Sequence, residues 1–291
     1  MMKVKPFFNR IVVLLFAVSM LLPIKTHAQI NNYFEDFMTE AKPSRKTATE
    51  LFEEIKIANE KVTSVTENVS LYSTVETEDE NTFSQQWALL DLLFDQDQAI
   101  KAAILYFESE ENDQSYFEES FLPSDEKAVL VRSSENDEWV NQVEDSSEDL
   151  EYFANPNYHL LMDSLVNISD GLQVFEDENH YIFLNNGQDM NLFDEFQPHY
   201  DLYVTGIDSE DFTTDIMVSF DKETLLLTEF SYILYYDKND EYLEISVNTI
   251  MEMWNEYHED MFKKEIINNT PDLEQELEEI RDSMNLDDIK I

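Results

Sequence analysis

The strongest constraint on the fold is a series of three β-prone runs near the end of the chain. The runs are 216–220, 225–236 and 242–250, and short polar turns at 221–224 and 237–240 separate them. This spacing predicts a three-stranded antiparallel meander. In the middle run apolar side chains occupy both sets of alternate positions. Both faces of that strand must therefore be covered, or one of them must line a cavity.

A cationic, apolar leader precedes this acidic chain. Basic residues up to Arg10 come before the apolar run 11–24, and small residues lie near Ala28, which is the pattern of an export signal. We assign residues 1–28 as a signal peptide and expect a secreted or extracytoplasmic, cell-envelope location after cleavage. The run is short for a bilayer span. Cleavage is therefore favoured over an uncleaved anchor, which would be the only expected membrane contact.

The charge balance restricts the partners. The chain carries 64 acidic and 18 basic side chains, a formal charge of −46, and such a protein is repelled by nucleic acids and anionic lipid surfaces. We therefore expect no nucleic-acid partner. No Lys or Arg occurs from Ser133 through Asp221. Charge runs are usually solvated faces, and the alternative is a surface for a cationic protein partner or divalent cations.

The residue types exclude several chemistries. The chain has no cysteine, which rules out disulfides, thiolate metal sites, cysteine nucleophiles and lipid attachment at a lipobox. Its three glycines lie far apart, so phosphate-binding loops and a GxSxG serine hydrolase are also excluded. The histidines form no HExxH pair. We expect no metal, no cofactor and no enzyme activity, and leave open a carboxylate-based hydrolase and loose calcium binding by acidic loops.

The organisation before the meander is read from local signals. A lead-in at 29–46 precedes a helix that begins with a capping box at Thr47 and Glu50. The apolar stripe that should place this helix against a sheet consists of Ala48, Leu51, Ile55, Ala58 and Val62. One α+β domain is expected over 47–262, followed by a helical tail at 263–291.

Between the first helix and the meander, the chain alternates between strand and helix signals. Strand-like runs lie at 65–75, 87–94, 100–107, 116–122, 128–131, 172–175 and 181–184, with a hairpin turn at 108–114. Helices are predicted at 145–153, at 156–166 and around 190–196. For the second of these, Asn155 is the expected cap, Pro156 the first helical residue and Gly171 the end of the helical region.

Aromatic residues supply the only candidate ligand-binding groups. Taken singly, aromatic residues at strand spacing usually form core. Taken together, they would suit an apolar ligand cleft, which typically combines a hydrophobic lining with few polar groups. The candidate lining residues are Trp87, Trp139, Phe230 and Tyr232.

The order of elements resembles a known family. The residues that carry the resemblance are Leu51, Phe52, Ile55 and Ala58 in the first helix, Val62–Val65, the segment Lys127–Arg132 followed by Glu138 and Trp139, and the hairpins at 221–224 and 237–240. They resemble uncharacterised envelope lipoproteins of Gram-positive bacteria that are similar to the LolA/LppX-like lipid-carrier superfamily. The resemblance covers roughly Thr47 to Glu259, and it transfers no functional residue.

The resemblance implies a strongly curved antiparallel sheet, a half-open barrel, wrapped around helices. The function expected from it is that of an exported, non-enzymatic binding protein that holds a lipid or other hydrophobic ligand in the cavity of the sheet. The alternative is a secreted acidic interaction protein that binds a cationic partner or divalent cations.

Overall fold

The computed structural model describes residues 41–77, 81–111, 114–126, 128–133, 138–141, 154–185, 192–238 and 241–265. They form one curved, open antiparallel sheet of twelve strands together with helices, in the order β1-β8-β9-β10-β11-β12-β2-β3-β4-β5-β6-β7. The strands are β1 Lys42–Pro43, β2 Ser64–Glu76, β3 Asn81–Phe94, β4 Ile100–Glu111, β5 Gln114–Leu122, β6 Leu130–Arg132, β7 Val140–Asn141, β8 Gln173–Glu176, β9 His180–Leu184, β10 Thr213–Asp221, β11 Leu227–Lys238 and β12 Glu241–Glu252. The predicted α+β fold class is confirmed.

Two meanders are joined side by side. Strands β2 to β7 follow one another across one half of the sheet and β8 to β12 across the other. The halves meet where the last long strand pairs with the first, with Thr249 of β12 opposite Val69 of β2. The pairing of β12 with β2 therefore joins the two meanders in the middle of the open sheet.

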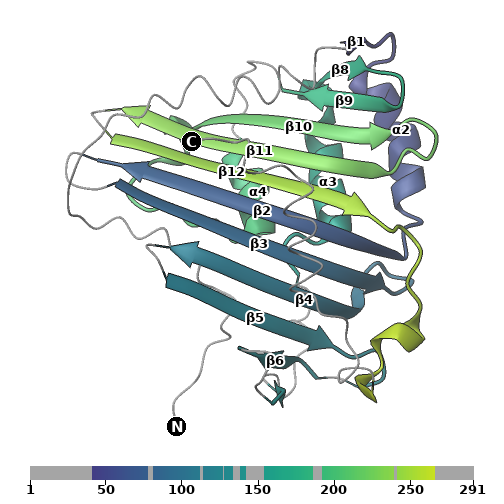
Figure 1. Cartoon of the computed structure of the whole chain (residues 1–291). Coiled ribbons are helices and arrows are strands. Elements are labelled where there is room, and N and C mark those ends of the chain that lie inside the picture. Colours follow the sequence, from purple (N-terminus) through teal and green to yellow (C-terminus); the bar gives the residue numbers. More distant parts are fainter. Residues whose placement is uncertain are drawn as a thin grey trace.

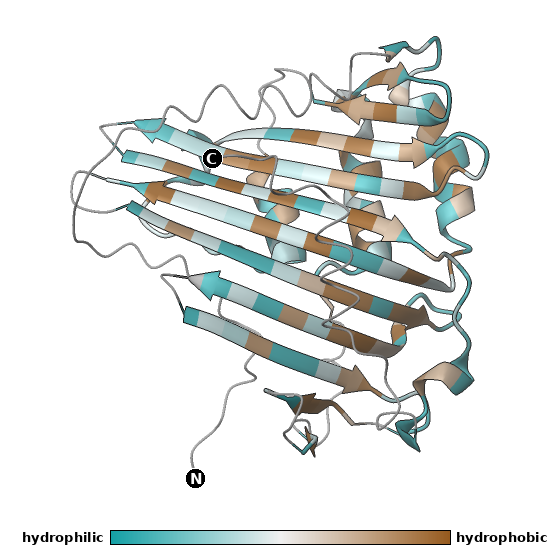
Figure 2. Cartoon of the chain, in the orientation of Figure 1, coloured by the Kyte–Doolittle hydropathy of each residue, from teal (hydrophilic) through white to brown (hydrophobic). Residues whose placement is uncertain are grey.

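The helices lie on one side of the sheet (Figure 1). They are α2 Ala48–Asn59, α3 Tyr158–Ile168 and α4 Phe193–Phe196, with the short 3₁₀ turns η1 Ser169–Gly171 and η2 Gln197–Tyr200. Two further 3₁₀ turns are η3 Ser209–Asp211 and η4 Glu259–Phe262, and η4 packs on the other side of the sheet through Phe262. We call the sheet face on which α2, α3 and α4 pack the inner face, and the opposite one the outer face. Hydropathy alternates along most strands, because successive side chains point to opposite faces (Figure 2).

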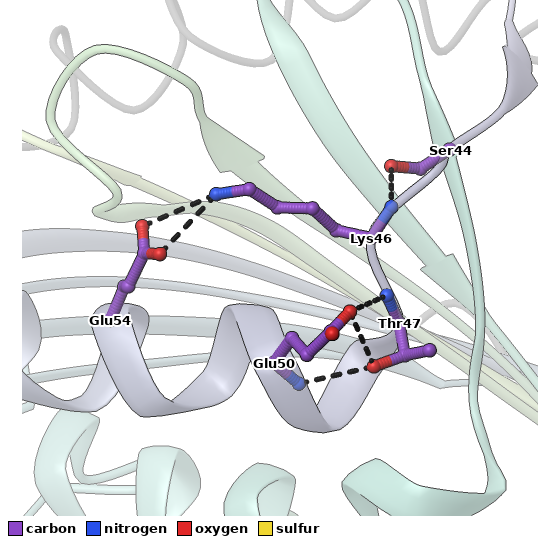
Figure 3. Close-up of polar contacts among 5 residues, drawn as sticks. All are labelled: Ser44, Lys46, Thr47, Glu50 and Glu54. Carbon is purple, nitrogen blue, oxygen red and sulfur yellow. Dashed lines mark hydrogen bonds and ion pairs between the residues drawn. The ribbon is translucent and has the colours of Figure 1, made fainter.

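The start of α2 has the predicted capping box (Figure 3). The Thr47 hydroxyl accepts a hydrogen bond from the Glu50 backbone N–H at 3.3 Å, and the Glu50 carboxylate accepts one from the Thr47 N–H at 2.9 Å. These bonds lower the pKa of Glu50. Lys46 and Glu54 form an ion pair at 3.3 Å beside the box. The first turn of the helix is therefore fixed by local polar contacts, and its apolar stripe is free to face the sheet.

The main core lies between the helices and the inner face. Phe52 of α2 meets Phe183 of β9 and Phe220 of β10 edge-on, with ring centroids 5.0 and 5.7 Å away. The predicted stripe is confirmed at Ala48, Leu51, Ile55 and Val62, which are buried there, whereas Ala58 is half-buried. Smaller apolar clusters lie on the outer face.

The second long helix begins later than predicted. Asn157, and not Asn155, caps α3, and its side chain accepts hydrogen bonds from the backbone N–H groups of His159 and Leu160. Helical geometry thus starts at Tyr158, and Pro156 precedes it. An Asn stands on each side of the proline, and the pattern alone favoured the first. Gly171 does end the helical region, at the close of η1.

The remaining elements agree with the predictions in type and differ at their ends. Strands β4 and β5 extend to Glu111 and from Gln114, so the turn predicted at 108–114 is much shorter. Lys42 and Pro43, within the predicted lead-in, pair with β8. The predicted signal peptide, the helix at 145–153 and the tail helix lie outside the described residues, and the domain boundaries stay predictions.

Candidate binding site on the inner face of the sheet

Two of the four predicted ligand-lining residues lie on the inner face. Phe230 and Tyr232 of β11 are both fully buried in the main core. The Phe196 ring of α4 covers them, at 5.0 and 5.7 Å between centroids. Tyr200 of η2 stacks on Phe230 at 6.0 Å. The short α4 and η2 segment thus forms a lid of aromatic rings over the centre of the sheet.

The other two predicted residues lie elsewhere. Trp87 of β3 belongs to a separate outer-face cluster with Leu89 and Tyr106. Trp139 stands beside the edge strands, with the Arg132 guanidinium 4.9 Å from its ring centroid. The four aromatic residues therefore do not form one surface. A role for any of them in ligand binding stays a prediction, and only Phe230 and Tyr232 are close enough to share a ligand.

The polar centre of the inner face is a glutamate that the sequence analysis did not single out. Glu67 of β2 is in phase with Val65 and Val69, so its side chain points into the main core. Its neighbours across the sheet are Leu90 of β3 and Met251 of β12. Its exposed fraction is 0%, and neither carboxyl oxygen has a hydrogen-bond partner in the part of the chain that the structure describes. Burial raises the pKa of Glu67 well above its ordinary value.

Two tyrosine hydroxyls lie within the electrostatic field of this carboxyl group. Burial raises the pKa of Tyr158 and of Tyr200, and the charge of Glu67 raises each of them further. Both hydroxyls have partners: Tyr158 donates to Asn59, and Tyr200 shares a 3.0 Å hydrogen bond with Thr249. Helix α3 and turn η2 therefore place hydroxyl groups toward the same region of the core.

Two further polar atoms of the core have no hydrogen-bond partner among the described residues. They are the hydroxyl oxygen of Tyr232 and the indole nitrogen of Trp254. Trp254 follows β12 and packs against the main core. It stands between Met253 and Asn255, whose φ angles of 54° and 62° are left-handed. Left-handed geometry at residues other than glycine is uncommon and costs conformational energy, so the surrounding contacts hold this indole in place.

Asn255 anchors that bend. Its side-chain oxygen accepts a 2.7 Å hydrogen bond from the Thr63 backbone N–H, and its own N–H donates to the Ser64 carbonyl at 2.9 Å. Both partners lie directly before or at the start of β2, three or four residues ahead of Glu67. The indole of Trp254 is thus tied by backbone contacts to the strand that carries the buried carboxyl group.

A serine and a histidine meet in the helical layer. The Ser164 hydroxyl of α3 lies 2.9 Å from Nε2 of His199 in η2, and both residues are buried. Burial lowers the pKa of His199 to about 4, an effect that Glu195 opposes. In the described part of the chain no carboxylate accepts a hydrogen bond from this imidazole, so the orienting group of a catalytic triad is missing there. The pair is a contact between α3 and η2, and the prediction of a non-enzymatic protein stays untested.

Within the described ranges, no three His, Asp or Glu side chains come together in a way that could hold a metal ion. None of the helices in those ranges is both long and apolar enough to cross a bilayer.

Comparison with known proteins relates this chain to others by fold only. No family model matches it, and no curated protein is similar to it in sequence. Among solved structures, LprF from Mycobacterium bovis is 12% identical over 74% of this chain and 96% of its own, with a TM-score of 0.39. A DUF1329 family protein from Desulfovibrio piger is 7% identical over 76% and 97%, with a TM-score of 0.24. Similarity this distant supports no inference about a shared function.

Proposed function

We propose that this chain is an exported, non-enzymatic binding protein that holds a hydrophobic or amphiphilic ligand between the inner face of its sheet and the helical layer. The observation that carries the proposal is a pair of polar groups without described partners inside an apolar core: the Glu67 carboxyl and the Tyr232 hydroxyl. Buried polar groups are nearly always hydrogen-bonded. Ligand sites, in contrast, combine apolar walls with a few polar groups that await the ligand.

The lid over this region is suited to movement. Helix α4 spans only Phe193–Phe196, and η2 follows it directly at Gln197–Tyr200. So short an element holds its position mainly through its aromatic contacts with Phe230 and Tyr232. A ligand with an apolar chain can replace ring contacts by equivalent contacts of its own, because hydrophobic packing is not directional.

One part of the inner face lies beyond the helices. Figure 1 shows no helix behind the N-terminal ends of β3 and β5 and the C-terminal end of β4. Inner-face residues there are only partly covered: Gln86 and Phe107 are half-buried, and Tyr116 is 38% exposed. An amphiphilic ligand that entered from this side would meet aromatic and amide groups before it reached the apolar centre.

The proposal can be tested with native mass spectrometry of the exported protein, followed by titration of the ligand-free full chain with decanol. We expect a co-purified hydrophobe or, after its removal, saturable binding of decanol. Repeated recovery of the bare mass together with no decanol binding would refute the proposal.

Tryptophan fluorescence locates the bound ligand. Trp254 packs on the inner-face core, whereas Trp87 and Trp139 lie in the outer-face clusters. Decanol should therefore change an emission signal that Trp254→Phe removes. Trp87→Phe and Trp139→Phe are the matched controls and should keep the signal. Loss of the signal in a control and its retention in Trp254→Phe would place the ligand on the wrong face.

A second function is favoured by the charge distribution. No Lys or Arg occurs from Ser133 through Asp221, and exposed carboxylates there include Asp163, Asp170, Glu178, Asp194 and Glu210. A cationic protein or divalent cations would neutralise this surface. Such binding should weaken steeply between low and physiological salt, whereas decanol binding should not. Salt-insensitive association with a basic protein would contradict this second function.

A further inference from the structure

Glu67 has no electrostatic compensation in the described part of the core. Its neighbours along and across the strands are apolar: Val65, Val69, Leu90 and Met251. A carboxylate removed from water without a partner is strongly disfavoured, and an isosteric apolar residue would fit this position better. A residue that breaks the local rules without a structural benefit marks a functional position.

We propose that Glu67 is the recognition group of a site for the ammonium end of an amine-bearing amphiphile. The inference rests on the proposed function and names the chemical class of its ligand. A protonated amine has only N–H donors to offer, and the carboxyl oxygens of Glu67 have no described donors. Because burial raises the pKa of Glu67 in the ligand-free protein, binding of the ammonium group is expected to release the carboxyl proton to solvent.

Polar oxygen atoms near Glu67 suit a cation. The charge of Glu67 raises the pKa of both Tyr158 and Tyr200, so both hydroxyl groups lie within its electrostatic range. Tyr158 donates to Asn59, and Tyr200 shares its hydrogen bond with Thr249. Their hydroxyl oxygens still have lone pairs that can accept a hydrogen bond from an ammonium group. Helix α3 and turn η2 thus each bring an acceptor toward the carboxyl group.

Other ligand classes fit less well. An anionic headgroup would be repelled by a chain with a formal charge of −46, and it would gain no opposite charge from Glu67 in either protonation state. A neutral headgroup could accept a hydrogen bond from the protonated Glu67 carboxyl but would supply no positive charge to stabilise the ionised form. A bare metal ion requires several oxygen ligands, and no suitable group of three acidic or histidine side chains occurs in the described ranges. The apolar walls therefore favour an amine that carries a hydrocarbon chain.

The test compares three head groups on one chain length. Decylamine, decanol and decanoate are titrated calorimetrically into the full-length protein at pH 7.5 and physiological salt. We expect decylamine to bind roughly ten- to a hundredfold more tightly than decanol, the usual gain from a hydrogen bond to a charged group. Decanoate should bind more weakly than decanol.

Glu67→Gln keeps the shape of the side chain and removes its charge. In this variant the preference for decylamine over decanol should fall to about one, and Glu67→Met should give the same result if the amide itself disturbs the core. Glu53→Gln is the matched control, because Glu53 is exposed on α2 and its substitution changes the net charge by the same amount. It should keep the wild-type preference, since only surface attraction is altered.

The outcomes separate this inference from the function on which it rests. If decanol binds and the amine preference is absent, or survives in both Glu67 variants, the ammonium site is wrong while the binding function stands. If none of the three probes binds to the wild-type protein, the binding function itself fails. An amine preference lost equally in Glu53→Gln would show that surface charge alone produced it, which also overturns the site.

Discussion

Two carboxyl groups on adjacent strands of the sheet differ in the face on which they lie and in their hydrogen bonding. Glu67 of β2 points to the inner face and has no described hydrogen-bond partner, whereas Asp91 of β3 lies on the outer face and accepts two hydrogen bonds. These come from the hydroxyls of Thr66 at 2.7 Å and Tyr257 at 2.6 Å. Burial raises the pKa of both groups, but for Asp91 the two hydroxyls oppose that shift. Only Asp91 therefore has a structural role that explains its burial.

That role is to hold the segment after β12 on the outer face. Tyr257 also donates its backbone N–H to the Ser64 hydroxyl at 3.0 Å, and the Ser124 hydroxyl donates to the Glu259 carbonyl at 2.8 Å. Phe262, at the end of the segment, is buried against the outer face. Strands β2 and β3 thus carry two carboxyl groups of different kinds. Asp91, on the outer face, is hydrogen-bonded and holds the segment after β12 in place. Glu67, on the inner face, has no described hydrogen-bond partner and holds no segment.

The largest effect is expected from Asp91→Ala. It removes the acceptor that the two hydroxyl groups share, leaves them only their 2.6 Å contact with each other and loosens the segment that carries Tyr257, so we expect the free energy of unfolding to fall by about 3 kcal/mol. Denaturant titration measures this change. Asp97→Ala, at an exposed turn position, should stay within about 0.5 kcal/mol of wild type. A loss below about 1 kcal/mol for Asp91→Ala would show that this contact does not hold the segment.

Glu67→Met should change stability in the opposite direction. It replaces a buried carboxyl group that lacks described partners by an apolar side chain of similar size, and the ligand-free protein should gain about 2 kcal/mol at pH 8. The same denaturant titration detects it. If Glu67→Met destabilises the protein as Asp91→Ala does, Glu67 has a structural partner, and the contrast between the two faces disappears.

The pH dependence of stability sharpens the contrast. The pKa of Glu67 is raised in the folded state, so its folded form holds a proton that the unfolded chain has already released. The associated stability is complete below the ordinary carboxyl range and is lost as pH rises from there toward the raised pKa. One such group contributes at most about 1.4 kcal/mol per pH unit.

The comparison of wild type with Glu67→Gln isolates this contribution. Unfolding free energies measured from pH 4 to 9 should fall more steeply for wild type, and the two curves should converge at the acidic end. Other carboxylates affect both proteins alike, so they cancel in the difference. Parallel curves across the whole range would contradict a raised pKa for Glu67.

The sequence was sufficient for the fold where one periodicity prevailed. Strand β12 alternates between apolar and polar residues, and polar turns separate it from β11 and β11 from β10, so the meander could be predicted. Strand β11 is apolar on both sets of alternate positions, which predicted that both of its faces are covered or that one lines a cavity. The sequence did not show on which face of the sheet Trp87 lies. Strand β3 carries leucines at 89, 90, 92 and 93, on both sets of alternate positions, so no alternation showed which face the tryptophan would occupy.

The candidate site was only partly predictable for a related reason. Phe230 and Tyr232 were identified because they lie in a strand that is rich in aromatic residues and apolar on both faces. Glu67 carried a usable signal, since it occupies the inward phase set by Val65 and Val69. The sequence contains 64 acidic residues, so this signal alone could not distinguish Glu67 from the others. Only the register of β2 with β12 and β3 placed its side chain in the core. The position of Trp254 against the core depends on the left-handed backbone of its two neighbours, which no sequence pattern indicated.

The smallest effect is expected from Tyr257→Phe. This change removes one donor to Asp91 and keeps the ring, which packs edge-on against Phe262 with centroids 5.7 Å apart. Thr66 still donates to Asp91, so we expect a loss of about 1 kcal/mol. In a double-mutant cycle, Tyr257→Phe should cost less once Asp91 is alanine, because the carboxylate acceptor is gone and the 2.6 Å contact with the Thr66 hydroxyl remains. An equal loss in both backgrounds would mean that the Tyr257 hydroxyl acts through another contact and that Asp91 is less well satisfied than its geometry indicates.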